Sequence, residues 1–295
     1  MLNEKCIVNH SCYFGATNNN YTEFDKLDKH RVCGIKLFMG SSTGNMLVDK
    51  MNSLLNIFNG TDMLIAAHCE DQETIKNNIE KYKQKYKGAD DIPVSAHPSI
   101  RSVPACYASS ELAVRLAKIA GARLHILHVS TAKELQLFSD EPLASKNITA
   151  EACVAHLLFT LTHYNSLGTR IKCNPAVKRK TDREALRAAV NSGLIDVIAT
   201  DHAPHLLNEK EGGALKAMSG MPMIQFSLVS MLELVDEGVF SLETVVQKMC
   251  HAPARIYGIC HRGYIREGYQ ADLVLVRPNS PWEVSADKIL SKCGW

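Results

Sequence analysis

Runs of apolar, β-branched residues alternate with longer amphipathic stretches along most of the chain. The apolar runs predict six strands, at residues 7–14, 34–39, 63–68, 123–129, 148–153 and 196–200. Amphipathic spacing predicts helices at 105–120 and 183–192, and each is followed by a glycine, Gly121 or Gly193, that can end a helix. Strands that alternate with helices in this way are typical of a parallel α/β sheet.

Polar or ionisable side chains lie in or at the ends of five predicted strands. They are Lys36, His68, His128, Glu151 and Asp201. Catalytic groups of a TIM-type barrel sit at the carboxyl ends of its strands. The glycine-rich first turn of a dinucleotide-binding sheet is missing from this sequence. The pattern therefore favours an α/β fold of the TIM-type (β/α)8 barrel kind.

The alternation of apolar runs and amphipathic stretches ends at about residue 255. Residues 263–276 read as two short strands joined by a glycine-bounded turn, and residues 86–104, polar with three prolines, as a long loop over the mouth of the barrel. We therefore expect a barrel domain over residues 1–255 and part of a small β-sandwich appendage over residues 256–295.

Composition narrows the class of protein. Of the 295 residues, 46% are hydrophobic and 22% are charged, which is enough apolar side chain for a large core and excludes a disordered chain. The net charge of +2 gives no reason to expect nucleic acid or a membrane as a partner. Ten scattered cysteines without a C-x-x-C pair indicate free thiols, and with no export signal we expect a cytoplasmic protein.

The residues at the strand ends indicate metal chemistry. Imidazole and carboxylate groups such as those of His68, His128 and Asp201 are suitable ligands for zinc. Lys36 leaves two interpretations open. Its side chain either points outward from an alternating strand, or is buried, in which case the amine loses its charge and can react with carbon dioxide to form a carbamate that bridges two metals.

One motif is more specific than the rest. Residues 199–205, A-T-D-H-A-P-H, followed by Lys210, resemble the signature of the class I dihydroorotases in the amidohydrolase superfamily. Four further segments match the same family: G-I-K-L-F-M-G at 34–40, A-A-H-C-E at 66–70, L-H-V-S at 127–130 and C-N-P-A-V-K at 173–178. The resemblance extends from about residue 7 to residue 276.

This resemblance implies a zinc-dependent cyclic amidohydrolase that interconverts N-carbamoyl-L-aspartate and (S)-dihydroorotate in pyrimidine biosynthesis. Lys36 would be the bridging carbamate, and His68 and His128 would hold the second of two metals. Asp201 would bind the first metal and act as general acid and base. The small-molecule substrate would contact two further residues, Asn174 and His205.

The neighbours of these residues receive less specific roles. His202 follows Asp201 directly and is expected to be structural or to support the ligands, and His125 is expected to pack on the opposite face of its strand. For Glu151, the sequence leaves open whether the side chain lines the site. Residues 220–222, G-M-P, are expected to shape the substrate loop.

The chain also departs from the family pattern. It has no His-x-His pair, which the family places on its first strand as ligands of the first metal. The matched strands correspond to about strands three to eight, so we expect an incomplete barrel and a fragment that is weakly active or inactive by itself. Two alternatives stay open: a hydantoinase, dihydropyrimidinase or allantoinase, and a non-catalytic dihydroorotase-like subunit. The partners considered are a second copy of the chain and a transcarbamoylase.

Overall fold

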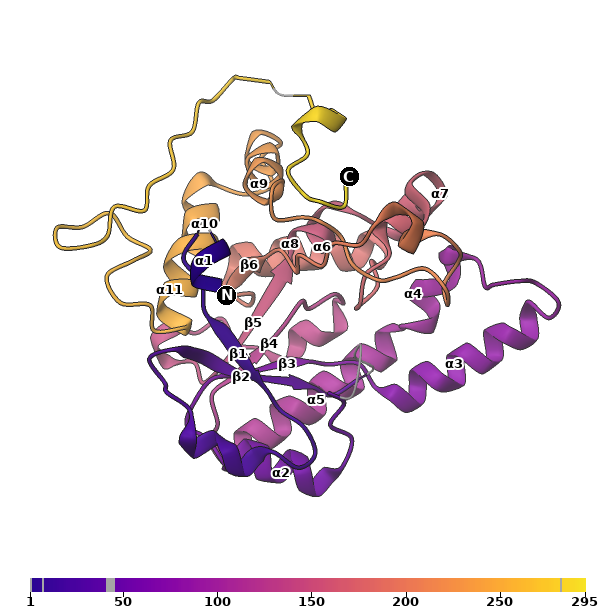
Figure 1. Cartoon of the computed structure of the whole chain (residues 1–295), viewed down its shortest axis with the longest axis horizontal. Helices are drawn as coiled ribbons and strands as arrows, with labels where there is room; N and C mark the ends of the chain where they lie inside the picture. Colours follow the sequence, from indigo (N-terminus) through magenta and orange to yellow (C-terminus); the bar gives the residue numbers. More distant parts are fainter. Residues whose placement is uncertain (1, 7, 41–45, 282) are drawn as a thin grey trace.

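A single parallel sheet of six strands organises the molecule, in the order β1-β2-β3-β4-β5-β6 (Figure 1). The structure is a computed structural model that describes residues 2–6, 8–40, 46–281 and 283–295. Every neighbouring pair of strands is parallel. This confirms the predicted α/β fold class, with six of the eight strands of a (β/α)8 barrel. The carboxyl ends of all six strands therefore lie at one edge of the sheet.

Strands and helices follow the predicted order along the chain. The strands are β1 (Cys12–Gly15), β2 (Val32–Phe38), β3 (Ile65–His68), β4 (Leu124–Ile126), β5 (Ile148–Cys153) and β6 (Val197–Ala199). The helices are α1 (Leu2–Lys5), α2 (Met51–Asn59), α3 (Gln72–Lys85), α4 (His97–Ile100), α5 (Val103–Ala120), α6 (Val154–Leu158), α7 (Tyr164–Leu167), α8 (Lys180–Ser192), α9 (Ser227–Asp236), α10 (Leu242–Val246) and α11 (Ala252–Ile256).

Two predictions about particular segments need correction. The first strand begins only at Cys12, and residue 7, where it was predicted to begin, lies outside the described residues, as do residues 41–45. The predicted loop at 86–104 is partly helical, because a short 3₁₀ helix (Val94–Ala96) runs into α4 and α5 begins at Val103.

The core lies between the sheet and the helices on its outer side. Helix α5 is capped at its start by Ser102, whose side chain accepts a hydrogen bond from the backbone of Ala105. It is followed by Gly121 in the left-handed conformation with φ 65°. Its apolar face packs on alternate strand residues that have no exposed surface, among them Ile35, Leu37, Ile65, Leu124 and Ile126. Because alternate residues of a strand point to opposite faces, the residues between them face the other side of the sheet.

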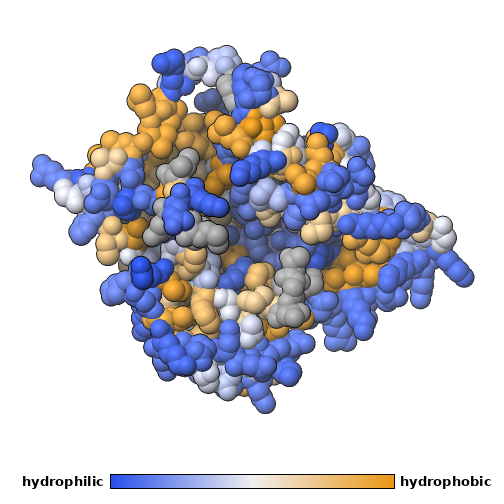
Figure 2. Space-filling view, in the orientation of Figure 1, coloured by the Kyte–Doolittle hydropathy of each residue, from blue (hydrophilic) through white to orange (hydrophobic). Residues whose placement is uncertain are grey.

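The C-terminal segment differs from its prediction. The two short strands expected within 263–276 do not form, and among the described residues after 257 the structure has no strand. The segment is extended along the upper left of Figure 1, with Ile265 89% and Leu275 99% exposed. A lone pair of strands is marginally stable in water, so alternating apolar residues without partner strands do not suffice. Figure 2 shows apolar surface gathered on the side of the molecule where this segment lies.

The described part of the chain contains no helix that combines the length and the apolar character needed to cross a membrane.

A buried lysine holds the loop after β6 in place. Lys210 is 2% exposed, and its Nζ donates hydrogen bonds to the carbonyl oxygens of Lys172 (3.0 Å), Met218 (2.8 Å) and Gly220 (2.8 Å). Gly220 has φ 146°, and a Cβ there would come within 2.3 Å of the Ala203 carbonyl oxygen, so this close approach of two backbone segments requires glycine. The loop with residues 201–205 is thereby fixed to the loop with residues 172–178.

Replacing Lys210 by methionine is expected to lower the free energy of unfolding by about 2–4 kcal/mol, because two buried carbonyls and one partly buried carbonyl would each lose a hydrogen bond from its ammonium group. Lys216 in the same loop is the matched control, since it is half exposed and pairs only with the exposed Asp90. Lys216→Met is expected to change the free energy by less than about 0.5 kcal/mol. Urea denaturation of both variants measures this, and equal losses would contradict the role given to Lys210.

Candidate metal centre

Four of the six predicted site residues lie at one edge of the sheet. Lys36 is on β2, His68 ends β3, His128 follows β4 by two residues, and Asp201 follows β6 by two residues. In the register of the sheet, Phe38 of β2 lies beside His68 of β3. The parallel topology thus brings residues far apart in the sequence to the same end of the strands.

His68 and His128 form the closest pair of this group. The Nδ1 atom of His68 lies 3.1 Å from the Nε2 atom of His128, and the two side chains belong to residues that are 5% and 4% exposed. Burial lowers the pKa of both rings, and for His128 the neighbouring His68 lowers it further. Both imidazoles are therefore neutral at pH 7, which is the form that binds a metal.

The spacing of the two nitrogens fits a shared metal ion. Two nitrogens that each bind zinc at about 2.0–2.1 Å in tetrahedral geometry are about 3.4 Å apart, close to the 3.1 Å between His68 and His128. The second ring nitrogen of His128, Nδ1, is buried without a hydrogen-bond partner. The pair therefore fits two ligands of one metal ion.

The structure favours the buried interpretation of Lys36. Its strand neighbours Ile35 and Leu37 have no exposed surface and pack in the outer core, so Lys36 faces the other side of the sheet. Burial lowers the pKa of its amine, while the charges of Glu151 and Asp201 act in the opposite direction. The Lys36 Nζ also lies 4.5 Å from the centre of the Phe38 ring. Lys36 is thus half-buried and faces the inner side of the sheet, with an amine that is easier to deprotonate than an exposed one.

Asp201 lies at the mouth of this arrangement. The Asp201 side chain is accessible to solvent but largely surrounded by protein. This partial desolvation and the charge of Glu151 raise its pKa to about 6, although the charge of Lys36 acts in the opposite direction. Among the described residues, no group of three or more His, Cys, Asp or Glu side chains is preformed to hold a metal. The structure brings the two histidines together and leaves Asp201 outside their group.

The backbone is strained at two of these residues. His128 has φ 41° and Asp201 has φ 44°, values in the left-handed region that residues other than glycine rarely adopt. Such conformations cost on the order of 1–3 kcal/mol each and cluster at functional sites. Strain at two residues that the sequence selects on chemical grounds is independent support for a site here.

The two predicted substrate residues have different surroundings. Asn174 has an Oδ1 atom that is buried without a partner, so its side chain keeps an unused acceptor. His205 is half-buried, with its Nε2 atom 3.2 Å from the carbonyl oxygen of Ser219 and its Nδ1 atom 3.7 Å from a carboxylate oxygen of Glu209. The Asn174 amide is available to a ligand, whereas the His205 ring already has protein neighbours.

The neighbouring histidines have structural contacts. His202 accepts a hydrogen bond from the backbone of Ile224 through Nδ1, as its predicted structural role requires. His125 is fully buried, but it does more than pack, because its ring contacts Thr149 (2.8 Å) and Glu151 (3.1 Å). Glu151 also accepts a hydrogen bond from the backbone of His128, so it is held beside the site.

The sequence places one more carboxylate, Glu70, in the polar cluster after His68 but assigns it no role, and it assigns none to Arg101. Glu70 has no exposed surface, and its Oε2 atom lies 3.2 Å from Nε2 of His68 and forms an ion pair with Arg101. The only signal in the sequence is its place two residues after His68 in H-C-E, beyond the end of the strand. The contact to a candidate ligand makes Glu70 part of the site.

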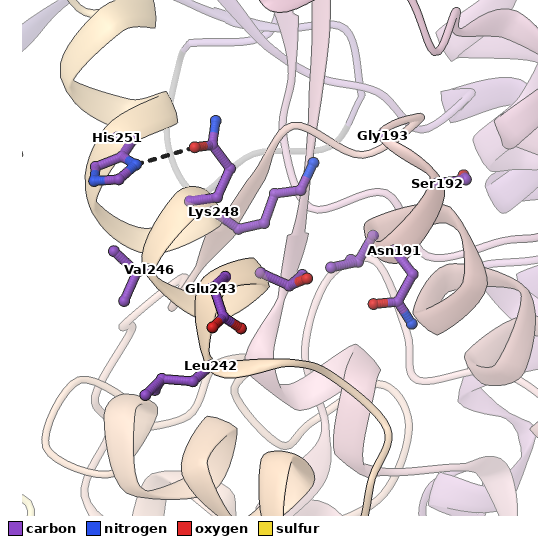
Figure 3. Close-up of a pocket in the computed structure, with 11 residues that line it drawn as sticks. Asn191, Ser192, Gly193, Leu242, Glu243, Val246, Lys248 and His251 are labelled. Carbon is purple, nitrogen blue, oxygen red and sulfur yellow. Dashed lines mark hydrogen bonds between the residues drawn. The ribbon is translucent and has the colours of Figure 1, made fainter.

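The pocket in Figure 3 lies elsewhere. It has a volume of about 640 Å³ and is lined by residues at the end of α8 and in α10 and the following turn, including Gly193, Leu242 and His251. Lys248 at this pocket donates a hydrogen bond to the carbonyl oxygen of Ile195 (2.6 Å). None of the six predicted site residues lines it.

Comparison with known proteins agrees with this arrangement. The family model described as "Amidohydrolase family" matches residues 16–290. A dihydroorotase from Geobacter metallireducens is 32% identical over 244 residues, which cover 82% of this chain and 55% of that protein. A dihydroorotase from Halobacterium salinarum is 32% identical over 262 residues, which cover 88% of this chain and 59% of that protein.

A solved structure is also similar. The L-hydantoinase (dihydropyrimidinase) from Arthrobacter aurescens has a TM-score of 0.82 and 27% sequence identity, over 90% of this chain and 60% of that one. The chain thus spans 55% to 60% of the length of these three proteins.

Two further buried histidines make the stability of this region sensitive to acid. Burial lowers the pKa of His97 to about 3 and that of His156 to about 4. Below pH 6.5 the unfolded state binds protons that these native rings do not, so the free energy of unfolding falls as the pH falls, and it is flat above that range. Each ring is expected to cost about 2 kcal/mol between pH 7.5 and pH 5.0.

Urea denaturation at the two pH values, with a chelator present, measures this dependence. His156→Gln is expected to reduce the pH dependence by about one proton, whereas His30→Gln at an exposed position leaves it unchanged. An unaltered dependence in His156→Gln would contradict the prediction.

Proposed function

The chain belongs to the amidohydrolase family, and from this premise we propose that it is a dihydroorotase that interconverts N-carbamoyl-L-aspartate and (S)-dihydroorotate in pyrimidine biosynthesis. The 3.1 Å approach of the His68 and His128 ring nitrogens, at strand ends shared with Lys36 and Asp201, is the observation that carries the proposal. Support also comes from dihydroorotases that are 32% identical over most of the chain.

We propose that the metal is zinc, held by His68 through Nδ1 and by His128 through Nε2. Lys36, once carboxylated, would supply the anionic ligand between this ion and a second ion at Asp201. A bound zinc ion lowers the pKa of a coordinated water and polarises the amide carbonyl of the substrate. Carboxylation suits this role because it would turn the Lys36 amine, which repels a metal ion when protonated, into an anionic oxygen ligand.

The remaining residues would handle the proton and the substrate. Asp201, with a pKa of about 6, can hold and release a proton near neutral pH, and it would deliver that proton to the ring nitrogen that leaves the carbonyl carbon. The Asn174 amide, with its unused acceptor, would orient the dihydropyrimidine ring. His205 would contact the substrate carboxylate once its ring turns from Ser219.

Two alternatives have observations in their favour. A hydantoinase or dihydropyrimidinase activity is supported by the similarity to the Arthrobacter aurescens enzyme, and an allantoinase would use the same kind of site. A non-catalytic subunit is supported by the lack of a preformed three-residue metal group in the described part of the chain. A homodimer, a transcarbamoylase partner, a cytoplasmic location and an appendage formed by residues 256–295 stay predictions.

Rate measurements with several substrates test the proposal. Zinc-loaded protein is expected to act on dihydroorotate and carbamoyl aspartate at least about tenfold faster than on hydantoin, dihydrouracil or allantoin, since a pocket that hydrogen-bonds its substrate rejects analogues that lack the bonded group. Chelation is expected to abolish turnover and added zinc to restore it. A preference for hydantoin or allantoin would move the chain to the first alternative. Because weak activity is expected of an incomplete barrel, the second alternative follows if zinc-loaded protein neither binds nor turns over any of these substrates.

A variant at His128 tests the metal ligand. His128→Asn is expected to lower turnover at least about 100-fold, because it removes a ligand, while asparagine still tolerates the local φ of 41°. His30→Asn at an exposed position is the control and is expected to leave turnover unchanged. Full activity in His128→Asn would contradict the assignment.

A further inference from the structure

Glu70 is a buried carboxylate with both of its partners on one oxygen. Its Oε2 atom contacts Nε2 of His68 at 3.2 Å and pairs with Nη1 of Arg101, while Oε1 has no partner. The ion pair with the Arg101 guanidinium requires the ionised form of Glu70, and a carboxylate can only accept hydrogen bonds.

The contact to Glu70 decides which nitrogen of His68 carries the proton. A neutral imidazole has one N–H and one lone pair, and the proton belongs on the side of an acceptor. The Oε2 atom of Glu70 lies 3.2 Å from Nε2, and this nitrogen has no hydrogen-bond partner among the described residues, so Glu70 is the acceptor that its proton can turn to. With the proton on Nε2, the lone pair is on Nδ1, the atom that faces His128 at 3.1 Å.

The other tautomer of His68, with its proton on Nδ1, would prevent this nitrogen from binding a metal. A proton on Nδ1 of His68 would point at Nε2 of His128 and form a hydrogen bond between the rings across 3.1 Å. His68 would then have no lone pair on the nitrogen that faces His128, so it could not bind a metal there without first moving its proton. A carboxylate beside Nε2 disfavours this tautomer, because it would place a ring lone pair against an anion.

Arg101 stabilises the buried carboxylate of Glu70. Glu70 has no exposed surface, and a lone carboxylate in that position would be strongly disfavoured. Arg101 approaches from the segment between α4 and α5, so this partner comes from a different part of the chain than the histidines. The order of contacts is Arg101, Glu70, His68 and then His128.

We propose that Glu70, held by Arg101, is a positioning residue that keeps the proton of His68 on Nε2 and so leaves the Nδ1 lone pair open to the metal. The proposal rests on the metal centre of the proposed function but not on its substrate. A carboxylate that accepts from the far nitrogen of a histidine ligand also fixes the ring and makes the ligand more basic.

Two measurements on the 295-residue chain test this role. The first is zinc affinity, determined by competition with a chromophoric chelator, in Glu70→Gln. The amide lacks the charge that favours the Nε2 proton, so affinity is expected to fall about 10- to 100-fold. The control is Glu134→Gln, a buried carboxyl bonded by Ser110 and Thr131 instead of by a candidate ligand. Its affinity is expected to stay within about twofold, because it touches no ligand.

The second measurement reads the tautomer directly. In metal-free wild-type protein, ¹⁵N NMR is expected to show His68, identified by the signals lost in His68→Asn, with a protonated Nε2 and an unprotonated Nδ1. Glu70→Gln is expected to lose this preference. A wild-type His68 with its proton on Nδ1, or an unchanged zinc affinity in Glu70→Gln, would overturn the proposal.

A second variant covers a failure of Glu70→Gln to fold. Glu70→Met combined with Arg101→Met removes both charges together, so neither is left buried alone. It is expected to fold and to show the same loss of zinc affinity and of tautomer preference. If it folds and binds zinc as the wild type does, the proposal is wrong.

The outcomes separate this proposal from the proposed function. Wild-type protein that binds zinc tightly, with the expected loss in Glu70→Gln but no turnover of dihydroorotate, would sustain the positioning role and reject the dihydroorotase. Wild-type protein that turns over dihydroorotate, with Glu70→Gln equal to it in zinc affinity, would sustain the enzyme and reject the positioning role. Wild-type protein that binds no zinc would reject both.

Discussion

Two buried imidazole rings that face each other at 3.1 Å must both stay uncharged, and the rest of the site depends on this constraint. Burial keeps them neutral, because the charged form of an imidazole is disfavoured away from water. The cation of Lys36 adds to the same effect, since its charge lowers the pKa of both rings. The carboxylate of Glu70 contacts the ring of His68, and Arg101 compensates its charge.

The topology explains how such a group can form from distant parts of the sequence. Parallel strands place their carboxyl ends together, so side chains at those ends share one edge of the sheet whatever their separation along the chain. The loops after the strands then set the position and direction of these side chains. At His128 and Asp201 this adjustment uses a left-handed backbone, and at the loop after β6 it uses the three hydrogen bonds of Lys210.

The sequence predicted the strands well because apolar, β-branched runs with turn residues between them depend on local properties. It grouped His68, His128 and Asp201 because strand ends converge, and the structure brings the two histidines into contact but leaves Asp201 apart from them. It failed at residues 263–276, where alternating residues need partner strands to form a sheet. It also assigned no role to Glu70, because a charged residue just beyond a strand is usually exposed, and its burial against Arg101 depends on tertiary packing that spacing does not encode.

The left-handed backbone at His128 and Asp201 also limits how this chain can diverge. At φ near 40°, β-branched side chains collide with their own backbone, whereas glycine, asparagine and aspartate are tolerated. Homologues that abandon the chemistry but keep the fold should therefore drift towards those small residues at these two positions, and not towards valine, isoleucine or threonine. The backbone conformation would then still restrict these two positions after the chemistry had been lost.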